Sequence, residues 1–282
     1  MSSKDNFDGI DKALGSSAPN INPQIGMNEY GMSGLNRQAG YVMEEFLYDL
    51  QGRKGMKTYR EMADNDAIIG AILFAVDQII RSTKWDVEPF SVSRKDVKNA
   101  EFVQECMDDM SNTWLEFVSE VMSMLVYGFS LHEIVYKKRG GLDNPDPSSR
   151  SKFKDGKIGW RKMQMRAQDT IDHWIFDKQG GIRGCMQLAP PSYRQVVIPI
   201  EKCLLFRTQA HKNNPEGRSI LRNSYRSWYF KKKIEEIEGI GLERDLAGIP
   251  IAYVDPAIMS AGATADQQAM LEAIKKLIVN CF

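Results

Sequence analysis

Apolar residues recur at helical spacing after an N-terminal stretch rich in Gly, Ser, Asn and Pro. Thr58 and Glu61 fit a capping box, which predicts a helix that begins near Thr58. Its apolar positions follow a helical period: Ile68, Ile69, Ile72, Leu73, Val76, Ile79 and Ile80. We expect residues 1 to about 57 to form a flexible arm, poorly ordered to about residue 40 and interrupted by a short helix at 42–50.

Two further helices are predicted next. Apolar positions between 97 and 110 form one stripe, and those between 114 and 125 form a second. Thr113 and Glu116 form another capping box at the start of the second stripe. Gly128 is a suitable stop, because glycine readily adopts the left-handed conformation that ends helices. Residues 85–90 alternate apolar and acidic side chains, which predicts a short strand before these helices.

The middle of the chain consists of short segments with strand-like patterns. They lie at residues 131–138, 157–166, 173–176, 183–188, 195–198 and 203–206. The polar segment 139–156 predicts a loop, and Gln179-Gly180-Gly181 predicts a hairpin turn.

The last third of the sequence is helical again. A long helix is predicted from near Ser219 to at least Glu238, with a kink at Gly239 and Gly241. A short strand at 251–254 and a helix at 266–280 follow. The order of helices, then strands, then helices predicts an α+β fold.

Composition narrows the possible partners. Lys+Arg and Asp+Glu both count 37, so the net charge is zero and any attraction to nucleic acid requires a local patch. The longest apolar run, residues 67–76, has about half the length of a membrane span. The N-terminus lacks the apolar core of a signal peptide, so we expect assembly in a cytoplasm and no membrane partner. The four cysteines form no CxxC pair, which favours buried thiols over disulfides.

Several catalytic motifs begin in this sequence but none is completed. His132-Glu133 starts the zinc-protease motif HExxH, but Tyr136 stands where the second His is required. Residues 128–132 start a nucleophile elbow, but His132 replaces its second Gly. Three carboxylate pairs could bind a metal for phosphodiester cleavage: Asp64 with Asp66, Asp86 with Glu88, and Asp169 with Asp172. Because no basic partner stands at a characteristic spacing, we expect no catalysis, no metal site and no cofactor.

The sharpest local feature is the separation of charge along the long helix. Residues 207–233 hold eight basic residues and one acidic residue, and the sign reverses at 235–245. This arrangement opposes the helix dipole, so we expect a partner outside the helix: a polyanion, or the acidic half of a neighbouring copy. A solvated face is the third alternative. The candidate residues for a subunit interface or for DNA contact are Arg218, Arg222, Arg226, Lys231, Lys232, Lys233, Glu235, Glu236 and Glu238.

The order and spacing of several segments resemble the portal proteins of tailed bacteriophages, particularly those of the transposable-phage type. The resemblance covers about residues 58–255, and its pieces run from Met62 to Ile68, Trp85 to Pro89, Tyr127 to Tyr136, Ile198 to Lys202, Asn214 to Leu221, Tyr225 to Lys231 and Asp245 to Pro250. It implies a structural subunit of a dodecameric ring at one capsid vertex of the virion, through which double-stranded DNA is packaged and ejected.

The resemblance also implies partners and an internal division. Partners would be the major capsid and scaffolding proteins, the terminase large subunit, and head-completion or tail proteins. Residues 58–210 would form a wing of helices and short antiparallel strands, 211–249 a stem-like helix, and 250–282 the start of a clip-like region. Portals of this kind continue further, and this chain stops within an apolar helical pattern, so we expect a truncated, split or fragmentary chain.

Two other functions stay open on the sequence alone. A phage DNA-binding or adaptor module would use the basic residues without forming a ring. A metal-dependent nuclease would use one of the carboxylate pairs.

Overall fold

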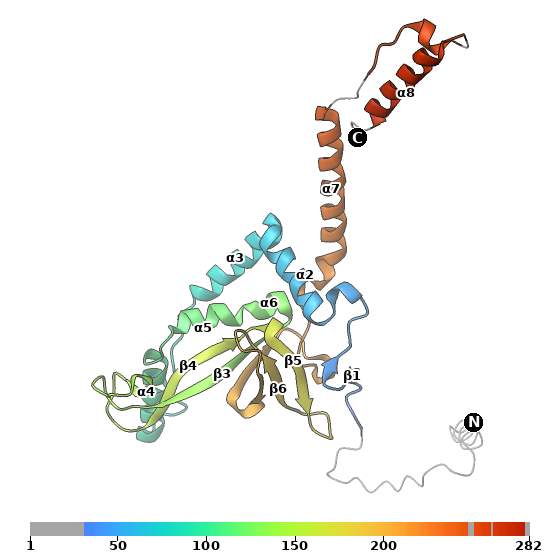
Figure 1. Cartoon of the computed structure of the whole chain (residues 1–282). Helices are drawn as coiled ribbons and strands as arrows, with labels where there is room; N and C mark the ends of the chain where they lie inside the picture. The colour runs from blue at the N-terminus through green and yellow to red at the C-terminus, as the bar shows by residue number, and fades with distance from the viewer. Residues whose placement is uncertain (1–30, 248–250, 261, 280–282) are drawn as a thin grey trace, which may run out of the picture.

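The computed structural model describes residues 31–247, 251–260 and 262–279. A body of helices and two small sheets carries one long helix that projects away from it (Figure 1). This composition confirms the predicted α+β class. The α-helices are α2 (Gly52–Asn65), α3 (Ala67–Arg81), α4 (Arg94–Asp108), α5 (Trp114–Val121), α6 (Ser123–Tyr127), the projecting α7 (Tyr225–Ala247) and α8 (Ala265–Val279).

The body holds two three-stranded antiparallel sheets, and all six strands predicted in the middle of the chain are present. The first has the order β4-β3-β8 and the second the order β5-β6-β7. Their bounds are β3 (Phe129–Lys138), β4 (Ile158–Arg166), β5 (Ile171–Phe176), β6 (Ile182–Leu188), β7 (Gln195–Pro199) and β8 (Cys203–Arg207). The predicted loop at 139–156 joins β3 to β4, and the predicted turn at 179–181 joins β5 to β6.

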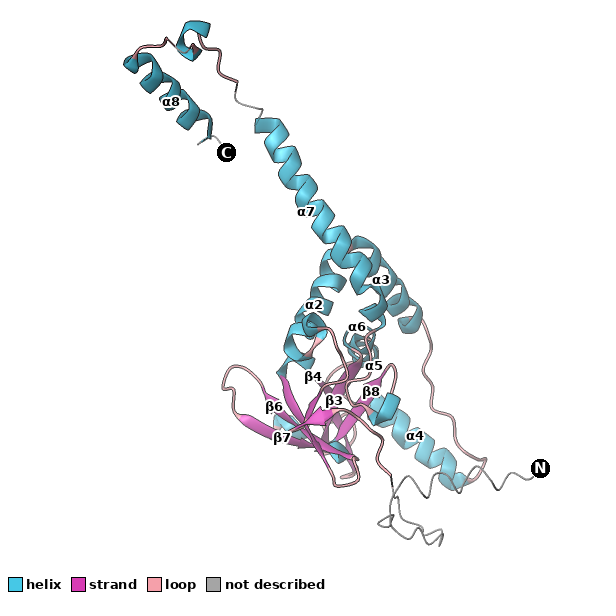
Figure 2. Ribbon diagram, turned by 90° about the vertical axis from the view of Figure 1, so that its right-hand side faces the viewer, coloured by secondary structure: helices cyan, strands magenta, loops and turns pink. Residues whose placement is uncertain are grey.

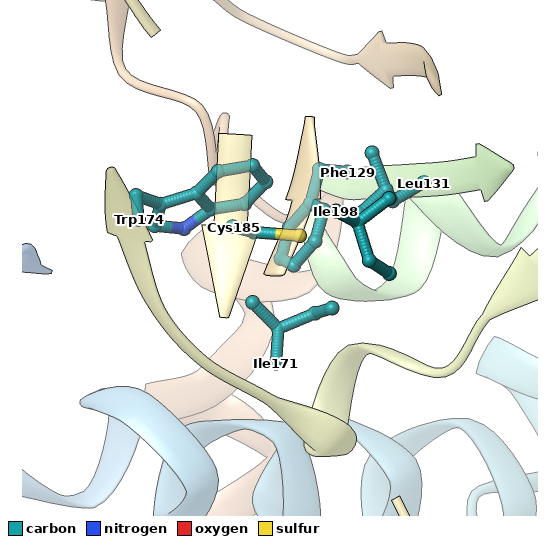
Figure 3. Close-up of a cluster of buried hydrophobic side chains, with 6 residues drawn as sticks. All are labelled: Phe129, Leu131, Ile171, Trp174, Cys185 and Ile198. Atoms are coloured by element: carbon teal, nitrogen blue, oxygen red, sulfur yellow. The ribbon is translucent and has the colours of Figure 1, made fainter. Parts of the chain in front are cut away.

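Strand β3 lies between two layers of the body. Successive side chains of a strand point to opposite faces, and Phe129 and Leu131 belong to the cluster that joins the two sheets. Figure 3 shows these two side chains beside Ile171, Trp174, Cys185 and Ile198. On the other face, α5 covers β3 and β4 with Phe117, Val118 and Val121, which pack on Met163. This alternation explains why β3 is buried along most of its first half.

A second cluster fixes the base of α7. Leu50, Tyr59 and Met62 come from the N-terminal part of the body, and they pack against Leu221 and Trp228. Leu50 ends the 3₁₀ helix η1 (Tyr48–Leu50), and Leu221 lies in η6 (Ile220–Ser224), which leads into α7. In Figure 2 the base of α7 lies beside α2 and α3, while its upper part stands clear of the body.

Two glycines let the backbone cross closely beside this cluster. Gly128 ends α6 with φ of 95°, as predicted, and a Cβ there would lie 2.5 Å from the carbonyl oxygen of Glu216. A Cβ at Gly217, where φ is 56°, would lie 2.2 Å from the oxygen of Gly128. Neither position accepts a side chain without backbone movement. The crossing joins the end of α6 to the loop that precedes α7.

The N-terminal segment differs from its prediction. Residues 36–51, called the N-terminal strap below, hold β1 (Arg37–Gln38), β2 (Tyr41–Val42) and η1, so the helix predicted at 42–50 was wrong. The strap is anchored to the second sheet, where the amide of Trp174 donates to the oxygen of Gly40 over 3.0 Å. Residues 1–30, where most of the flexible arm was predicted, lie outside the described residues.

The start of the first helix was also misplaced. Helix α2 begins at Gly52, so Thr58 lies inside it, and its hydroxyl donates to the carbonyl oxygens of Asp49 and Lys54. The predicted capping box at Thr58 is therefore absent. The second capping box is confirmed, because the Thr113 hydroxyl accepts from Glu116 N and the Glu116 carboxylate accepts from Thr113 N.

Three other local predictions were wrong. Residues 85–90 form no strand, because no neighbouring strand pairs with them; the amide of Val87 donates to the Gln104 side chain instead. Residues 251–254 are likewise not a strand. Helix α7 continues through Gly239 and Gly241 without the predicted kink. The predicted helix across 114–125 divides at Met122 into α5 and α6.

Candidate functional site

The base of α7 brings together the basic residues that the sequence singled out. The long helix does not begin as an α-helix at Ser219. Its first turn is the 3₁₀ helix η6, capped by the Ser219 hydroxyl, which accepts from the amide of Leu221 over 3.1 Å. Trp228 then fixes the orientation of α7 by packing against α2. The basic residues around Trp228 consequently face carboxylates of the N-terminal part of the body.

Arg222 is held by the N-terminal strap. Its guanidinium forms a two-point contact with the carboxylate of Glu45, with 2.9 Å between Nη2 and Oε1. Burial alone would raise the pKa of Glu45, but the Arg222 hydrogen bond and the amide of Leu47 together lower it. Two further contacts join the strap to this region: Lys212 with Glu44 at 3.0 Å, and the Tyr225 hydroxyl with Asp49 at 3.0 Å.

Lys231 and Lys232 are held by α2 and by the corner between α2 and α3. Lys231 Nζ lies 2.8 Å from Asp66 Oδ2. Asp66 also caps α3, because its Oδ1 accepts from the amides of Ile68 and Ile69. The hydrogen bond from Lys231 and the amide of Ile69 lower the pKa of Asp66. Lys232 pairs with Glu61 of α2. One carboxylate therefore both starts α3 and positions α7.

The remaining candidate residues have fewer partners. Lys233 pairs with Glu236 of the same helix at 2.8 Å, and Glu235 lies 4.0 Å from Lys231. Arg218 donates to the Asn223 side chain over 2.9 Å. Across the described part of the chain, neither Arg226 nor Glu238 forms a salt bridge. The guanidinium of Arg226 lies over the ring of Phe230, 5.7 Å from its centroid.

The sequence did not reveal the acidic partners of this basic run. Glu45, Glu61 and Asp66 lie more than 160 positions before the residues that they pair with. No local pattern links residues at such separations, so only the fold brings them together.

Above its base, α7 exposes apolar side chains to solvent. Ile234 and Ile237 are 61% and 69% exposed, and Phe230 is 53% exposed. At about 100° per residue, Ile237 lies about 180° around the helix from Trp228, Phe230 about 160° and Ile234 about 120°, so all three lie on the far side of α7 from Trp228. A helix with apolar residues outside its packed stripe is normally covered by another element. Within the chain, no described element covers this side of α7.

Two cavities of about 310 Å³ each lie between the strap, α2 and the loop before α7. Both are lined by Glu216, Val42 and Met56. Glu216 Oε1 accepts a hydrogen bond of 3.2 Å from Trp174 Nε1. Burial raises the pKa of the Glu216 carboxyl to about 7, despite that hydrogen bond. The sequence did not single out Glu216.

A buried Ser–His–Glu arrangement lies under α5. Ser130 Oγ is 2.7 Å from His132 Nε2, and His132 Nδ1 is 3.9 Å from Glu120 Oε2. Ser130 and His132 are two apart on β3, so their shared face could have been read from the sequence, whereas Glu120 on α5 could not. Burial lowers the pKa of His132 to about 4 and raises the pKa of Glu120. Ser130 and His132 have no exposed area, so no substrate reaches them.

The other chemically interesting residues have structural partners. Asp169 pairs with Arg60, and Asp172 contacts His173, Arg53 and the Tyr41 hydroxyl. The described residues contain no group of three or more His, Cys, Asp or Glu side chains placed to hold a metal ion. Cys106 and Cys185 are buried thiols as predicted, whereas Cys203 is only partly buried. Among the helices of the described segments, none is both long enough and apolar enough to cross a membrane.

A comparison with protein families gives one match over most of the chain. The family described as the portal protein of Mu bacteriophage matches residues 56–281. The match begins within α2 and includes α3, both three-stranded sheets and the whole of α7.

Proposed function

Because this chain belongs to the family of Mu bacteriophage portal proteins, we propose that it is a subunit of the portal ring of a phage head. Copies of the chain, about twelve under the family resemblance, form a ring at one capsid vertex. Double-stranded DNA passes through the ring into the head during packaging and out of it at infection. The family is structural and belongs to the phage particle.

The observation that best supports ring assembly is the exposed upper part of α7. The helix has 23 residues, so it is about 35 Å long. Trp228, Lys231 and Lys232 attach only its first turns to the body. Ile234 and Ile237 remain in solvent in the single chain. Neighbouring copies would cover such a helix, since burial of apolar surface is the main driving force of association.

The partners of the ring follow from the same proposal. The terminase large subunit docks on its outer side during packaging, and head-completion or tail proteins replace it afterwards. The major capsid and scaffolding proteins surround the ring during assembly in the host cytoplasm. Arg226 and Glu238, which have no salt-bridge partner in the described part of the chain, are our candidates for contacts between neighbouring copies.

We also propose that the chain has no catalytic activity of its own. The Ser130–His132–Glu120 arrangement is the nearest approach to a catalytic group, and its first two members are sealed in the core. At least one member of each carboxylate pair considered for a nuclease is engaged in helix capping or an ion pair: Asp66, Asp86 and Asp169.

A DNA-binding or adaptor module without ring assembly is the second candidate function. The run of basic residues at the base of α7 favours it. Yet Arg222, Lys231, Lys232 and Lys233 each face a carboxylate of their own chain. These pairs reduce the positive charge available to phosphates.

Electron microscopy of the purified chain in negative stain, together with its mass in solution, tests the proposal. We expect closed rings of uniform diameter with a central opening. A chain that stays monomeric over a wide range of concentration and salt, and that binds DNA in that state, would favour the adaptor function instead. For that function, the affinity for DNA should fall with salt by about 0.9 log units per phosphate contact for each tenfold increase in salt.

A further inference from the structure

Helix α3 presents an unusually apolar surface to solvent. None of its fifteen residues is buried, although its sequence is almost entirely apolar. Ile68, Ile72, Phe74 and Ile79 are each more than half exposed. Ile68, Ile72 and Ile79 lie along one side of the helix, because their spacings of four and seven residues match its turns. The inner side of α3 packs on α2 and α5.

The exposed side of α3 has the shape and charge of a helix-binding surface. Ala67, Ala71 and Ala75 are also exposed there, so small side chains lie between the large ones. Alternation of this kind forms the ridges and grooves into which the ridges of a second helix fit. Arg81, at the last residue of α3, pairs with Asp77 of the same helix at 3.7 Å, and Asp77 also accepts a hydrogen bond from the Ser119 hydroxyl. The surface of α3 therefore carries no unpaired charge that would repel a second helix.

The exposed stripe of α7 is the complementary surface on the same chain. Phe230, Ile234 and Ile237 form this stripe, and they face away from α2. At about 100° per residue, Glu238 lies on one flank of the stripe and Lys233 on the other. The α3 surface and the α7 stripe therefore lie on different helices of one chain, and none of the residues that the structure describes covers them. Two different surfaces that pair between copies make a heterologous contact, which closes into a ring when the rotation between copies permits.

We propose that the exposed surface of α3 in one copy receives the α7 stripe of the adjacent copy. This inference rests on the proposed portal function, because it takes a second copy of this chain as the occupant. Members of the family are oligomeric connectors of the phage head, which makes a second copy the natural partner. The contact positions the projecting helices around the ring, since each α7 then leans on the helical corner of its neighbour.

Cross-linking between separately substituted chains tests the contact. One chain carries Ile72→Cys and the other carries Ile237→Cys. The second chain also bears a tag, so that the two chains differ in length and can be told apart on a gel. Both carry Cys203→Ser and Cys281→Ser, and the buried Cys106 and Cys185 are kept. After mixing, assembly and mild oxidation, we expect a disulfide-linked heterodimer as the main product. Each chain alone should stay uncross-linked. Ile158→Cys, which replaces a 70% exposed side chain on β4, is the matched control for Ile72→Cys and should give none.

The outcomes separate this inference from the function on which it rests. Rings that form normally while the mixture gives no heterodimer would overturn the α3–α7 contact and leave the portal function standing. Dimers of the Ile72→Cys chain alone would mean that α3 packs on itself, which also overturns the contact. Failure of the parent chain to form any ring would count against the portal function itself. As a second measurement, Ile72→Asp should reduce ring yield at least tenfold with unchanged circular dichroism, and Ile158→Asp should not.

Discussion

Two ionisable groups, the fully buried His132 and the partly buried Glu216, show how removal from water acts on single residues. Burial moves the pKa of His132 down from 6.5 to about 4 and that of Glu216 up from 4.5 to about 7. Both shifts favour the neutral form, because charge is costly where water is excluded. The two groups therefore respond to acid in opposite directions over the same range of pH.

The signs follow from proton binding in the two states. Between pH 6.5 and 4, the unfolded chain protonates His132 and the fold does not. The stability contributed by neutral His132, about 3 kcal/mol, is thus present above pH 6.5 and lost as the pH falls toward 4. For Glu216, the fold binds the proton first, so its contribution is full below pH 4.5 and is lost as the pH rises through about 7. Glu120, whose pKa burial also raises, adds to the effect of Glu216.

Single substitutions at these positions should tilt the pH profile of stability in opposite directions. Protonation of His132 destabilises the fold as the pH falls. The unfolding free energy of His132→Gln should therefore fall less than that of the parent chain between pH 7 and 4.5. Protonation of Glu216 stabilises the fold over the same range, so the unfolding free energy of Glu216→Gln should fall more. Urea unfolding followed by tryptophan fluorescence measures both profiles. If stability depended on pH in the same way for the parent chain and both variants, the pKa shifts assigned to His132 and Glu216 would be wrong.

At the scale of elements, a buried ion pair joins β3 to the end of α4, and the loop 139–156 binds to the same carboxylate. Lys137 Nζ lies 2.9 Å from Asp109 Oδ2, and both side chains are about 95% buried. The Ser151 hydroxyl and the Lys152 amide also donate to the Asp109 carboxylate. Burial would raise the pKa of Asp109, but the hydrogen bonds from Ser151, Lys152 and Lys137 together hold it below its ordinary value.

Removal of one partner of this pair should be costly. Asp109→Ala leaves the Lys137 ammonium buried without its carboxylate, so we expect a loss of about 3–5 kcal/mol in the unfolding free energy. The double variant Asp109→Leu with Lys137→Met should recover much of that loss, because no charge remains buried. The exposed pair Lys84–Asp86 is the control, and Asp86→Ala should cost about 1 kcal/mol or less. Equal losses for Asp109→Ala and Asp86→Ala in denaturant titrations would refute this account.

The elements also show what local sequence patterns can and cannot predict. The capping box at Thr113 was predictable because every partner lies within four residues. The same pattern at Thr58 failed, because contacts of Leu50, Tyr59 and Met62 with Leu221 and Trp228 favour an earlier helix start. Residues 85–90 alternate as a strand does, but a strand also requires a neighbour, which the sequence does not identify. Likewise, the basic run before α7 was visible, whereas Glu45, Glu61 and Asp66 became its partners only through the fold.

At the scale of the whole molecule, the N-terminal strap and the α2–α3 corner set the direction in which α7 projects. Arg222 binds the strap through Glu45, and Lys231 and Lys232 bind the corner through Asp66 and Glu61. These contacts lie within one chain. Arg226, by contrast, is left for a contact outside the described part of the chain. Arg222 and Arg226 are four residues apart, yet a second substitution that restores an ion pair should rescue each of them through a different partner.

Charge reversal at Arg222 and at Arg226 therefore separates contacts within a copy from contacts between copies. Arg222→Glu should lower ring yield because α7 loses its support, and Glu45→Arg in the same chain should restore it. Arg226→Glu should also lower the ring yield, but without a change in the unfolding free energy. If the α7 helices of neighbouring copies are offset, Glu238→Arg in the same chain should restore the ring yield. One exposed pair contributes only about 0.2–1 kcal/mol, but a ring repeats it at every interface. Ring counts in negative stain and denaturant titrations measure the two effects. If Arg226→Glu forms normal rings that retain DNA less well, Arg226 contacts DNA instead. If both the rings and the retention of DNA are normal, Arg226 is a solvent-exposed residue with no role in assembly.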